Sequence, residues 1–325
     1  MTDDSNAALS ADPQVNDDAM LEGRAYDCVI IGGGPAGLTA ATYLGRFRRR
    51  AIVVDAGQSR AKWIPVSNNC PGFPDGIAGR DLLDRLRQQA LMSGADLVED
   101  TVTDLRRDGD DFVATASVPL RARTVLIATG ILDTLPYGRD VGGMISAGSL
   151  RVCPICDAYE VIDKRIGVIG PAEQALKKAL FMRTYTSDVT MLLPHPLVEL
   201  TGAASDEIKS AGINIEKCLP DTIHSLGRQA GIELAGGVIS AFDAIYPAMG
   251  CTILSKLATD LGAECDELGN LVVDSRQRTV VPGLYAAGDV VNEINQIAVA
   301  FGHAAISATD IHNYLADTDG TWQPK

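Results

Sequence analysis

Short apolar runs recur along the chain, and most are followed by glycine or by an acidic residue. Residues 26–31 are almost entirely apolar and predict a buried parallel strand, because strands covered on both faces lose the alternation of polar and apolar positions. A helical pattern over 38–47 and an apolar run over 51–54 complete a strand–helix–strand unit. Residues 124–129 predict another buried strand, and 82–92 are amphipathic at helical spacing. The pattern indicates an α/β protein.

A second strand–helix–strand unit follows in the middle of the chain. Residues 166–169 and 189–193 predict its strands, and 173–185 predict the helix between them. Sequence of the first type then returns, with a strand over 281–287 and a long helix over about 296–315. We therefore predict two Rossmann-like three-layer domains, the second inserted into the first.

The predicted bounds follow from this order. The first domain takes residues 26–131 and 248–325, and the inserted domain takes residues 132–247. Residues 1–25 are small, polar and acidic, which predicts a disordered tail.

Composition narrows the class of protein further. The 325 residues carry a formal net charge of −14, which repels nucleic-acid phosphates and disfavours them as partners. No apolar run has the length needed to span a bilayer. The first residues lack a basic stretch followed by an apolar one, so we expect a cytoplasmic protein.

The first glycine turn predicts a dinucleotide site. Gly32, Gly34 and Gly37 stand at the spacing of the Rossmann fingerprint, with Pro35 and Ala36 between the last two. Glycines there allow a tight turn, close approach of backbone N–H groups to a pyrophosphate, and close packing of helix on strand. Asp55 ends the next strand, where an acid accepts hydrogen bonds from a ribose.

Two of the seven cysteines form a Cys-x-x-Cys pair, Cys153 and Cys156, and the other five are scattered singly. A zinc site would need a second ligand pair at knuckle spacing, and the chain has none, so we expect no metal. The pair instead predicts thiol–disulfide exchange, in which a thiolate attacks a disulfide sulfur through a mixed disulfide.

In order and composition, these motifs resemble those of the low-molecular-weight thioredoxin reductases over about residues 26–316. The motifs are residues 32–37, Asn69-Cys70-Pro71-Gly72-Phe73-Pro74, Ala128-Thr129-Gly130, Cys153-x-x-Cys156-Asp157, Tyr285-Ala286-Ala287-Gly288-Asp289 and the closing helix. The resemblance implies an FAD domain built from both ends of the chain, an inserted second domain and a homodimer.

The resemblance also assigns roles to flavin-side residues. Gly288 and Asp289 would contact the ribityl-phosphate part of FAD, with Gly130 in the same set of cofactor contacts. Asn69 would lie beside the flavin, and Gln296 and Ile297 near its isoalloxazine ring.

For the disulfide, the resemblance implies that Cys156 faces the flavin and that Cys153 exchanges with a partner. Asp157 would handle protons, although an aspartate at that position is also typical of a helix N-cap. Ala158 departs from the family, which usually has glycine there.

The turn of the second unit departs most from the family. Where the reductases have a glycine-rich turn, residues 170–175 read Gly-Pro-Ala-Glu-Gln-Ala. Pro171 removes an N–H donor, and Glu173 adds negative charge at an anion site. After the next strand the reductases carry a His-Arg-Arg cluster for the 2′-phosphate of NADPH, whereas here only His195 stands between two prolines. The sequence therefore predicts that NADPH is not a cofactor.

The function that these features favour is that of an FAD-dependent dithiol/disulfide oxidoreductase that does not use NAD(P)H. The pattern is similar to ferredoxin-linked flavin reductases and to diflavin-linked disulfide oxidoreductases, and no motif separates the two. The partner would be a protein or small-molecule dithiol or disulfide, with ferredoxin or another non-nicotinamide carrier as an electron partner. Two other functions remain open: an NADPH-dependent thioredoxin reductase, and a non-catalytic flavin and thiol redox sensor.

Three further expectations concern the cover of the flavin, a basic run and a histidine. Without NADPH, the apolar face of the flavin needs a cover, and the candidates are a second FAD or the ring of Trp322. The basic run 46–50 predicts a solvated helix end. His303 predicts a packed histidine on the closing helix.

Overall fold

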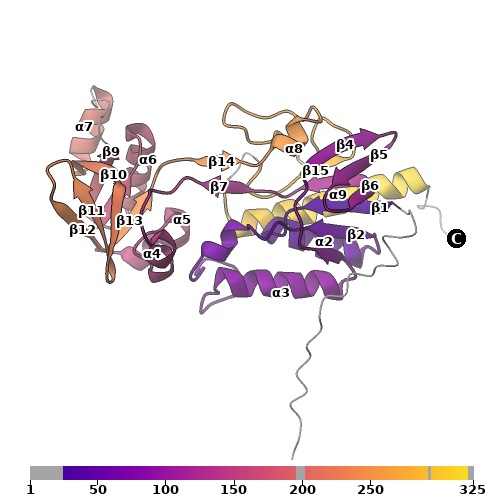
Figure 1. Cartoon of the computed structure of the whole chain (residues 1–325), viewed down its shortest axis with the longest axis horizontal. Helices are drawn as coiled ribbons and strands as arrows, with labels where there is room; N and C mark the ends of the chain where they lie inside the picture. The colour runs from indigo at the N-terminus through magenta and orange to yellow at the C-terminus, as the bar shows by residue number, and fades with distance from the viewer. Residues whose placement is uncertain (1–24, 195–201, 292–293, 321–325) are drawn as a thin grey trace, which may run out of the picture.

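Two mixed sheets form the framework of the chain, and the computed structural model describes residues 25–194, 202–291 and 294–320. The larger sheet has the order β3-β2-β1-β6-β5-β4, and β15 also pairs with β6. Its strands are β1 (Tyr26–Ile31), β2 (Ala51–Val54), β3 (Asp96–Val98), β4 (Asp104–Asp108), β5 (Asp111–Thr115), β6 (Pro119–Ile127) and β15 (Leu284–Ala286). Because β15 follows the second sheet in sequence, this first domain draws on both ends of the described chain (Figure 1).

The central strands of the larger sheet are its most apolar ones. β1 pairs in parallel with β2 and β6, and β2 is buried at all four positions. Continuous burial of this kind is what an all-apolar strand needs. β4, β5 and β6 form an antiparallel meander. The apolar runs of the sequence do not predict this meander, because β4 is mostly exposed and polar.

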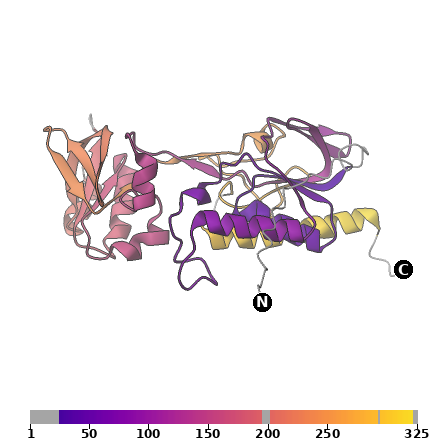
Figure 2. The same cartoon turned by 60° about the horizontal axis from the view of Figure 1, so that its bottom comes forward.

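Long helices cover one face of this sheet. They are α2 (Pro35–Arg46), α3 (Gly79–Met92) and α9 (Ile297–Asp319), and they share one apolar core with β1, β2 and β6. Figure 2 shows α3 and α9 running beneath the sheet. α2 begins at Pro35, three residues earlier than expected, because proline suits the first helical turn.

The second sheet has the order β12-β11-β10-β9-β8-β13. Its strands are β8 (Ile166–Ile169), β9 (Val189–Pro194), β10 (Asn214–Leu226), β11 (Gln229–Leu234), β12 (Ile239–Phe242) and β13 (Ala244–Pro247). One face packs with α6 (Ala172–Met182) and α7 (Ala203–Ser210), and the other packs with α4 (Val141–Ala147). This second domain is therefore also a three-layer Rossmann-like unit, as the sequence predicted.

Two short strands run between the domains. β7 (Ile131–Asp133) leads toward the second domain, β14 (Cys251–Ile253) leads back, and they pair antiparallel (Figure 1). Within the described residues, no helix is long and apolar enough to cross a membrane.

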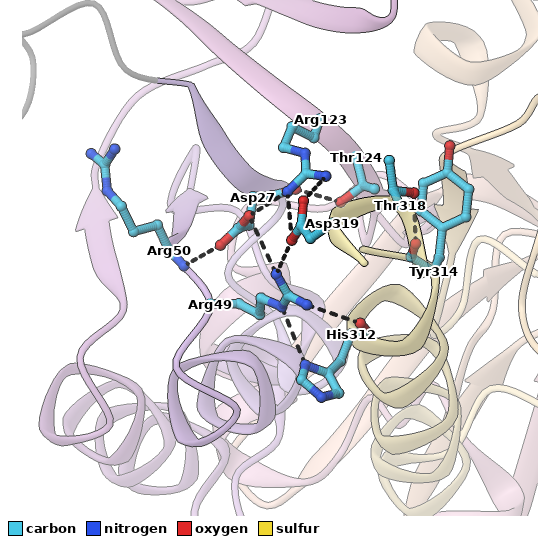
Figure 3. Close-up of polar contacts among 9 residues, drawn as sticks. All are labelled: Asp27, Arg49, Arg50, Arg123, Thr124, His312, Tyr314, Thr318 and Asp319. Atoms are coloured by element: carbon cyan, nitrogen blue, oxygen red, sulfur yellow. Dashed lines mark hydrogen bonds and ion pairs between the residues drawn. The ribbon is translucent and has the colours of Figure 1, made fainter. Parts of the chain in front are cut away.

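The end of α9 is fixed by an ion-pair cluster, which corrects the expectation that residues 46–50 are a solvated helix end. The side chain of Arg49 is only 11% exposed, and its guanidinium lies 3.0 Å from Asp319 and 3.9 Å from Asp27. The Nε of Arg49 also donates to Nδ1 of His312, at 3.2 Å (Figure 3). Arg46 and Arg48 are exposed, as expected, whereas Arg49 points at α9, which the local sequence does not reveal.

Candidate active site

The first glycine turn is too crowded for larger residues at two of its three positions. A Cβ at Gly32 would lie 2.3 Å from the carbonyl oxygen of Ala128, and a Cβ at Gly37 would lie 1.9 Å from that of Gly32. At Gly34 the nearest atom to such a Cβ is Oγ of Ser59, at 3.4 Å. The first and third glycines thus let the turn form and α2 approach it, as the phosphate-binding turn of a dinucleotide site requires.

The predicted ribose acid lies directly under this turn. Asp55 is 7% exposed, and its carboxylate accepts from the backbone N–H of Gly57, at 2.9 Å, and from Arg87, at 2.8 Å. A Cβ at Gly33 would lie 2.3 Å from that carboxylate. The turn and the acid therefore fit the adenosine end of FAD, and the flavin of that group supplies reversible two-electron chemistry when bound.

The second flavin motif lies against the first. Gly288 has a positive φ of 80°, and a Cβ there would lie 2.9 Å from Cβ of Ala36 on α2. The buried side chain of His303 faces the backbone N–H of Gly288 through Nδ1, at 3.4 Å, which confirms a packed histidine. Gly130 also takes a positive φ, of 68°.

An arginine that the sequence analysis missed joins this motif to a linking strand. Arg60, on the short helix η1 (Arg60–Trp63), donates to both carboxylate oxygens of Asp133, at 3.0 and 2.8 Å, and to Asp289, at 3.0 Å. The two carboxylates raise the pKa of Arg60, although its burial acts in the opposite direction. No motif spacing marks Arg60, so only the structure could reveal it.

Cys153 and Cys156 form a disulfide at the start of α5 (Pro154–Asp157). Cys153 is the N-cap residue, and its Sγ accepts from the backbone N–H of Cys156, at 3.2 Å. Pro154 follows at the first helical position, where its missing N–H costs no hydrogen bond.

The disulfide of the second domain rests on predicted flavin-side residues of the first. Gln296 directs its amide Nε2 at both sulfurs, at 3.5 Å from Cys153 and 3.6 Å from Cys156. Asn69 donates to the amide oxygen of Gln296, at 3.2 Å, and to the carbonyl of Ile155, at 3.4 Å. Residues from three distant parts of the sequence, all predicted for one redox site, are therefore brought together: Asn69, the Cys153–Cys156 pair and Gln296. Ile297, the next residue, packs on the helical core of the first domain.

Asp157 is held by two partners in the second domain. Its carboxylate accepts from the hydroxyl of Tyr246, at 2.8 Å, and pairs with Arg151, at 3.0 Å. Burial raises the pKa of Asp157, and Arg151 and Tyr246 counter that shift in part. Asp157 also occupies the N-cap position of the short helix η2 (Ala158–Val161), as the alternative expected, but its side chain makes no capping hydrogen bond there. Ala158 is right-handed helical, at φ −67°, and needs no glycine there.

A cleft of about 290 Å³ opens beside the disulfide, between the two domains. Its lining includes Cys153, Gln296, Arg60, Lys178 and Cys251. Three of these, Arg60, Lys178 and Cys251, were not among the predicted site residues. A small thiol compound in this cleft would meet the Cys153 side of the disulfide.

The turn of the second unit keeps one feature of the first. A Cβ at Gly170 would lie 2.3 Å from the carbonyl oxygen of Ala248, as one at Gly32 would from Ala128. Beyond Gly170, however, Pro171 is the N-cap of α6, and Ala175 is fully buried. Near the end of β9, where the reductases' phosphate-binding cluster would follow, Leu193 is buried. His195 lies outside the described residues.

These features define a class of protein: a two-domain Rossmann-like fold with a dinucleotide cradle in one domain and a disulfide of the other domain placed beside it. The chain belongs to the pyridine nucleotide-disulphide oxidoreductase family, whose sequence model matches residues 26–304.

Its relatives narrow that class to flavoprotein disulfide oxidoreductases of the thioredoxin-reductase type. The thioredoxin reductase of Streptomyces clavuligerus is 32% identical over 309 residues, which cover 89% of this chain and 93% of the relative. That of Listeria monocytogenes is 26% identical, covering 91% and 96%. The crystal structure of HlmI superposes with a TM-score of 0.84 at 29% identity, covering 91% and 94%.

Proposed function

We propose that this protein exchanges electrons between FAD and the Cys153–Cys156 disulfide without using NAD(P)H. The observation that supports the first half is the contact of Gln296, a residue expected to border the flavin, with both sulfurs of the disulfide. We assign the FAD site to residues 26–131 and 248–325, and the disulfide and degenerate nicotinamide unit to residues 132–247.

The turn after β8 supports the second half of the proposal. A pyrophosphate at the start of α6 would meet Pro171, which has no N–H, and the side chain of Ala172. Glu173 adds a negative charge in the first helical turn, paired only with the exposed Lys177 among the described residues. Helix N-termini favour anions, so a carboxylate there competes with a phosphate.

The second candidate is an NADPH-dependent thioredoxin reductase. The names of the relatives from Streptomyces clavuligerus and Listeria monocytogenes favour it. Under this alternative the same disulfide would pass electrons from NADPH to a protein disulfide such as that of thioredoxin. A non-catalytic sensor has no comparable support, because those relatives are named as enzymes.

Anaerobic stopped-flow spectroscopy of the FAD-loaded protein separates the candidates. We expect micromolar NADPH and NADH to leave the flavin oxidised, whereas dithiothreitol reduces it or shifts its spectrum. Each charge-assisted phosphate bond that is missing is worth about 1.5–3 kcal/mol, so nicotinamide affinity falls by several decades. Rapid bleaching by NADPH would instead establish the thioredoxin-reductase alternative.

A Cys156→Ser variant is the control for the disulfide. It should retain FAD, since Cys156 is not part of the glycine cradle, and it should lose the response to dithiothreitol. A variant that still responds fully would show that the flavin and the disulfide do not communicate, which contradicts the proposal.

The number of flavins bound per chain tests which group covers the flavin ring. We propose a second FAD per chain, with Trp322, which lies outside the described residues, as the alternative cover. Two flavins released per chain on denaturation support the second FAD. One flavin whose fluorescence rises when residues 318–325 are deleted supports Trp322, and one flavin indifferent to the deletion contradicts both.

The partners follow the same logic. We propose a homodimer that exchanges with a protein or small-molecule dithiol or disulfide, and ferredoxin as the candidate non-nicotinamide electron donor. Light scattering tests the dimer, and anaerobic flavin reduction by reduced ferredoxin tests the donor.

A further inference from the structure

Lys178 is a cation in the disulfide cleft that none of the ion pairs among the described residues includes. Its half-buried ammonium donates instead to two main-chain carbonyls, that of Val152, at 3.4 Å, and that of Pro247. Val152 immediately precedes Cys153, and Pro247 ends β13. The ammonium is therefore bound to the carbonyl of the residue that precedes Cys153, and both Lys178 and Cys153 line the cleft.

The neighbouring lysine on the same helix shows how unusual this placement is. Lys177 is 76% exposed and pairs with Glu173 one turn earlier, the ordinary arrangement for a surface lysine. Lys178 points the other way, into the cleft, where burial lowers the pKa of its ammonium. A charge removed from water acts more strongly on its neighbours because solvent screens it less.

The other ionic groups around the cleft are engaged with one another. Asp157 pairs with Arg151, and Arg60 is shared between Asp133 and Asp289. Lys178 is thus the positive charge that no carboxylate within the described chain neutralises by direct contact. A negative charge that forms at the cleft during reaction would find its counter-charge there.

We propose that Lys178 stabilises the thiolate of Cys153, and this inference rests on the proposed function. A substrate thiolate attacks Sγ of Cys153, the disulfide bond breaks, and its electron pair remains on Cys156. The second substrate thiol loses its proton to solvent and attacks the substrate sulfur of the mixed disulfide. Cys153 leaves as a thiolate, so the dithiol is oxidised by two electrons and the protein disulfide is reduced by two.

The same charge is useful in either direction of electron flow. In the reverse reaction the thiolate of Cys153 is the nucleophile, and only the thiolate form attacks a disulfide. A nearby cation raises the fraction of Cys153 in that form at neutral pH. Lys178 is therefore a positioning residue that acts through Cys153.

The measurement that tests this is the pKa of the Cys153 thiol. In an FAD-loaded Cys156→Ser background, the rate of iodoacetamide labelling is followed from pH 5 to pH 10 on the peptide that carries Cys153. Reading that peptide by mass spectrometry separates it from the exposed Cys251 and Cys265. We expect a thiol pKa clearly below the ordinary value of about 8.5.

Three substitutions at adjacent lysines distinguish charge from architecture. Lys178→Gln keeps an N–H donor and loses the charge, and it should raise the thiol pKa by about one unit, which slows labelling about tenfold at a pH below both pKa values. Lys178→Arg keeps the charge and should restore labelling to within about twofold. Lys177→Met, the matched control on the exposed side of α6, should leave the rate unchanged.

Two results would overturn the proposal. One is an ordinary Cys153 pKa in the background protein, which needs no Lys178 variant to fold. The other is an unchanged pKa in Lys178→Gln, which would leave Lys178 as a structural tie between two carbonyls. Labelling does not involve flavin reduction, so a failure of the proposed function would appear in the NADPH experiment and not here.

Discussion

The two glycine turns of this chain share their first residue and differ at each of the next five positions. Gly32 and Gly170 each abut a carbonyl on a neighbouring segment, and the Cβ that either lacks would lie 2.3 Å from it. At the third-glycine position the turns diverge, since Gly37 has no room for a Cβ whereas Ala175 carries one in a buried site. The comparison teaches that the first glycine is needed by the packing of any such turn. The third glycine is needed where a helix must approach closely enough to serve a phosphate.

The difference between the two turns is tested most directly by giving the first turn the alanine that the second has at its sixth position. Gly37→Ala should destabilise the protein by about 3 kcal/mol or more and release FAD, because its Cβ would overlap the carbonyl oxygen of Gly32. Urea unfolding and flavin fluorescence after gel filtration measure the two effects.

The matched change in the second turn is Ala175→Gly. It should cost only about 1–2 kcal/mol, for a helical glycine and a lost buried methyl group, and leave FAD bound. Equal flavin loss in both variants would mean that the two turns do not differ in function.

Asp157 tests whether the second domain kept its chemistry while its turn changed. Asp157→Asn should lower dithiol turnover by about 10²-fold, the usual loss for a positioned proton-transfer group. Steady-state oxidation of dithiothreitol with an artificial electron acceptor measures it, and an undiminished rate would remove Asp157 from the reaction.

Stability against pH gives a second measure of Asp157. Because burial raises its pKa in the folded protein, the folded state keeps a proton that the unfolded state has already lost. Stability should therefore fall as pH rises from about 3.9, the unfolded value, through the raised folded value. Asp157→Asn should remove that fall. If the urea midpoint of the unsubstituted protein does not change across the pH series, the raised pKa of Asp157 is contradicted.

Gly170→Ala asks whether the retained glycine serves packing alone. We expect about 1–3 kcal/mol of destabilisation from the contact with Ala248, with the flavin spectrum unchanged. Thermal unfolding monitored separately by circular dichroism and by flavin fluorescence would show the loss. An altered flavin spectrum would instead connect this turn to the cofactor.

The smallest effect is expected at Glu173. Its pair with Lys177 is exposed at the surface of α6, so Glu173→Gln should leave the urea unfolding midpoint essentially unchanged. If the turn still binds nicotinamide, the same change should strengthen NADPH binding by removing a charge beside the phosphate. Isothermal titration with NADPH distinguishes the two outcomes.

The sequence was most informative where chemistry demands a local pattern. The glycine turn at Gly32, the strand that ends at Asp55 and the Cys153–Cys156 pair all appear at the expected places, because their spacing reflects backbone geometry. The β4–β6 meander was not predicted because its outer strand is polar. The roles of Arg60 and Tyr246 were not predicted because their partners lie far away in sequence. The prediction for Arg49 was wrong for the same reason, because a basic run does not reveal that Asp319, at the end of another helix, binds this arginine.

α9 joins two polar sites that lie at its opposite ends. Its N-cap residue, Gln296, contacts the disulfide, and its last residue, Asp319, is bound by Arg49 and by Arg123 (Figure 3). The 23 residues of α9 form a rod roughly 34 Å long. One inserted residue would turn the amide of Gln296 by about 100° away from the sulfurs while the far end stayed fixed. The contacts at its two ends therefore fix the number of residues in α9, whereas they leave the sequence of its outer surface unconstrained.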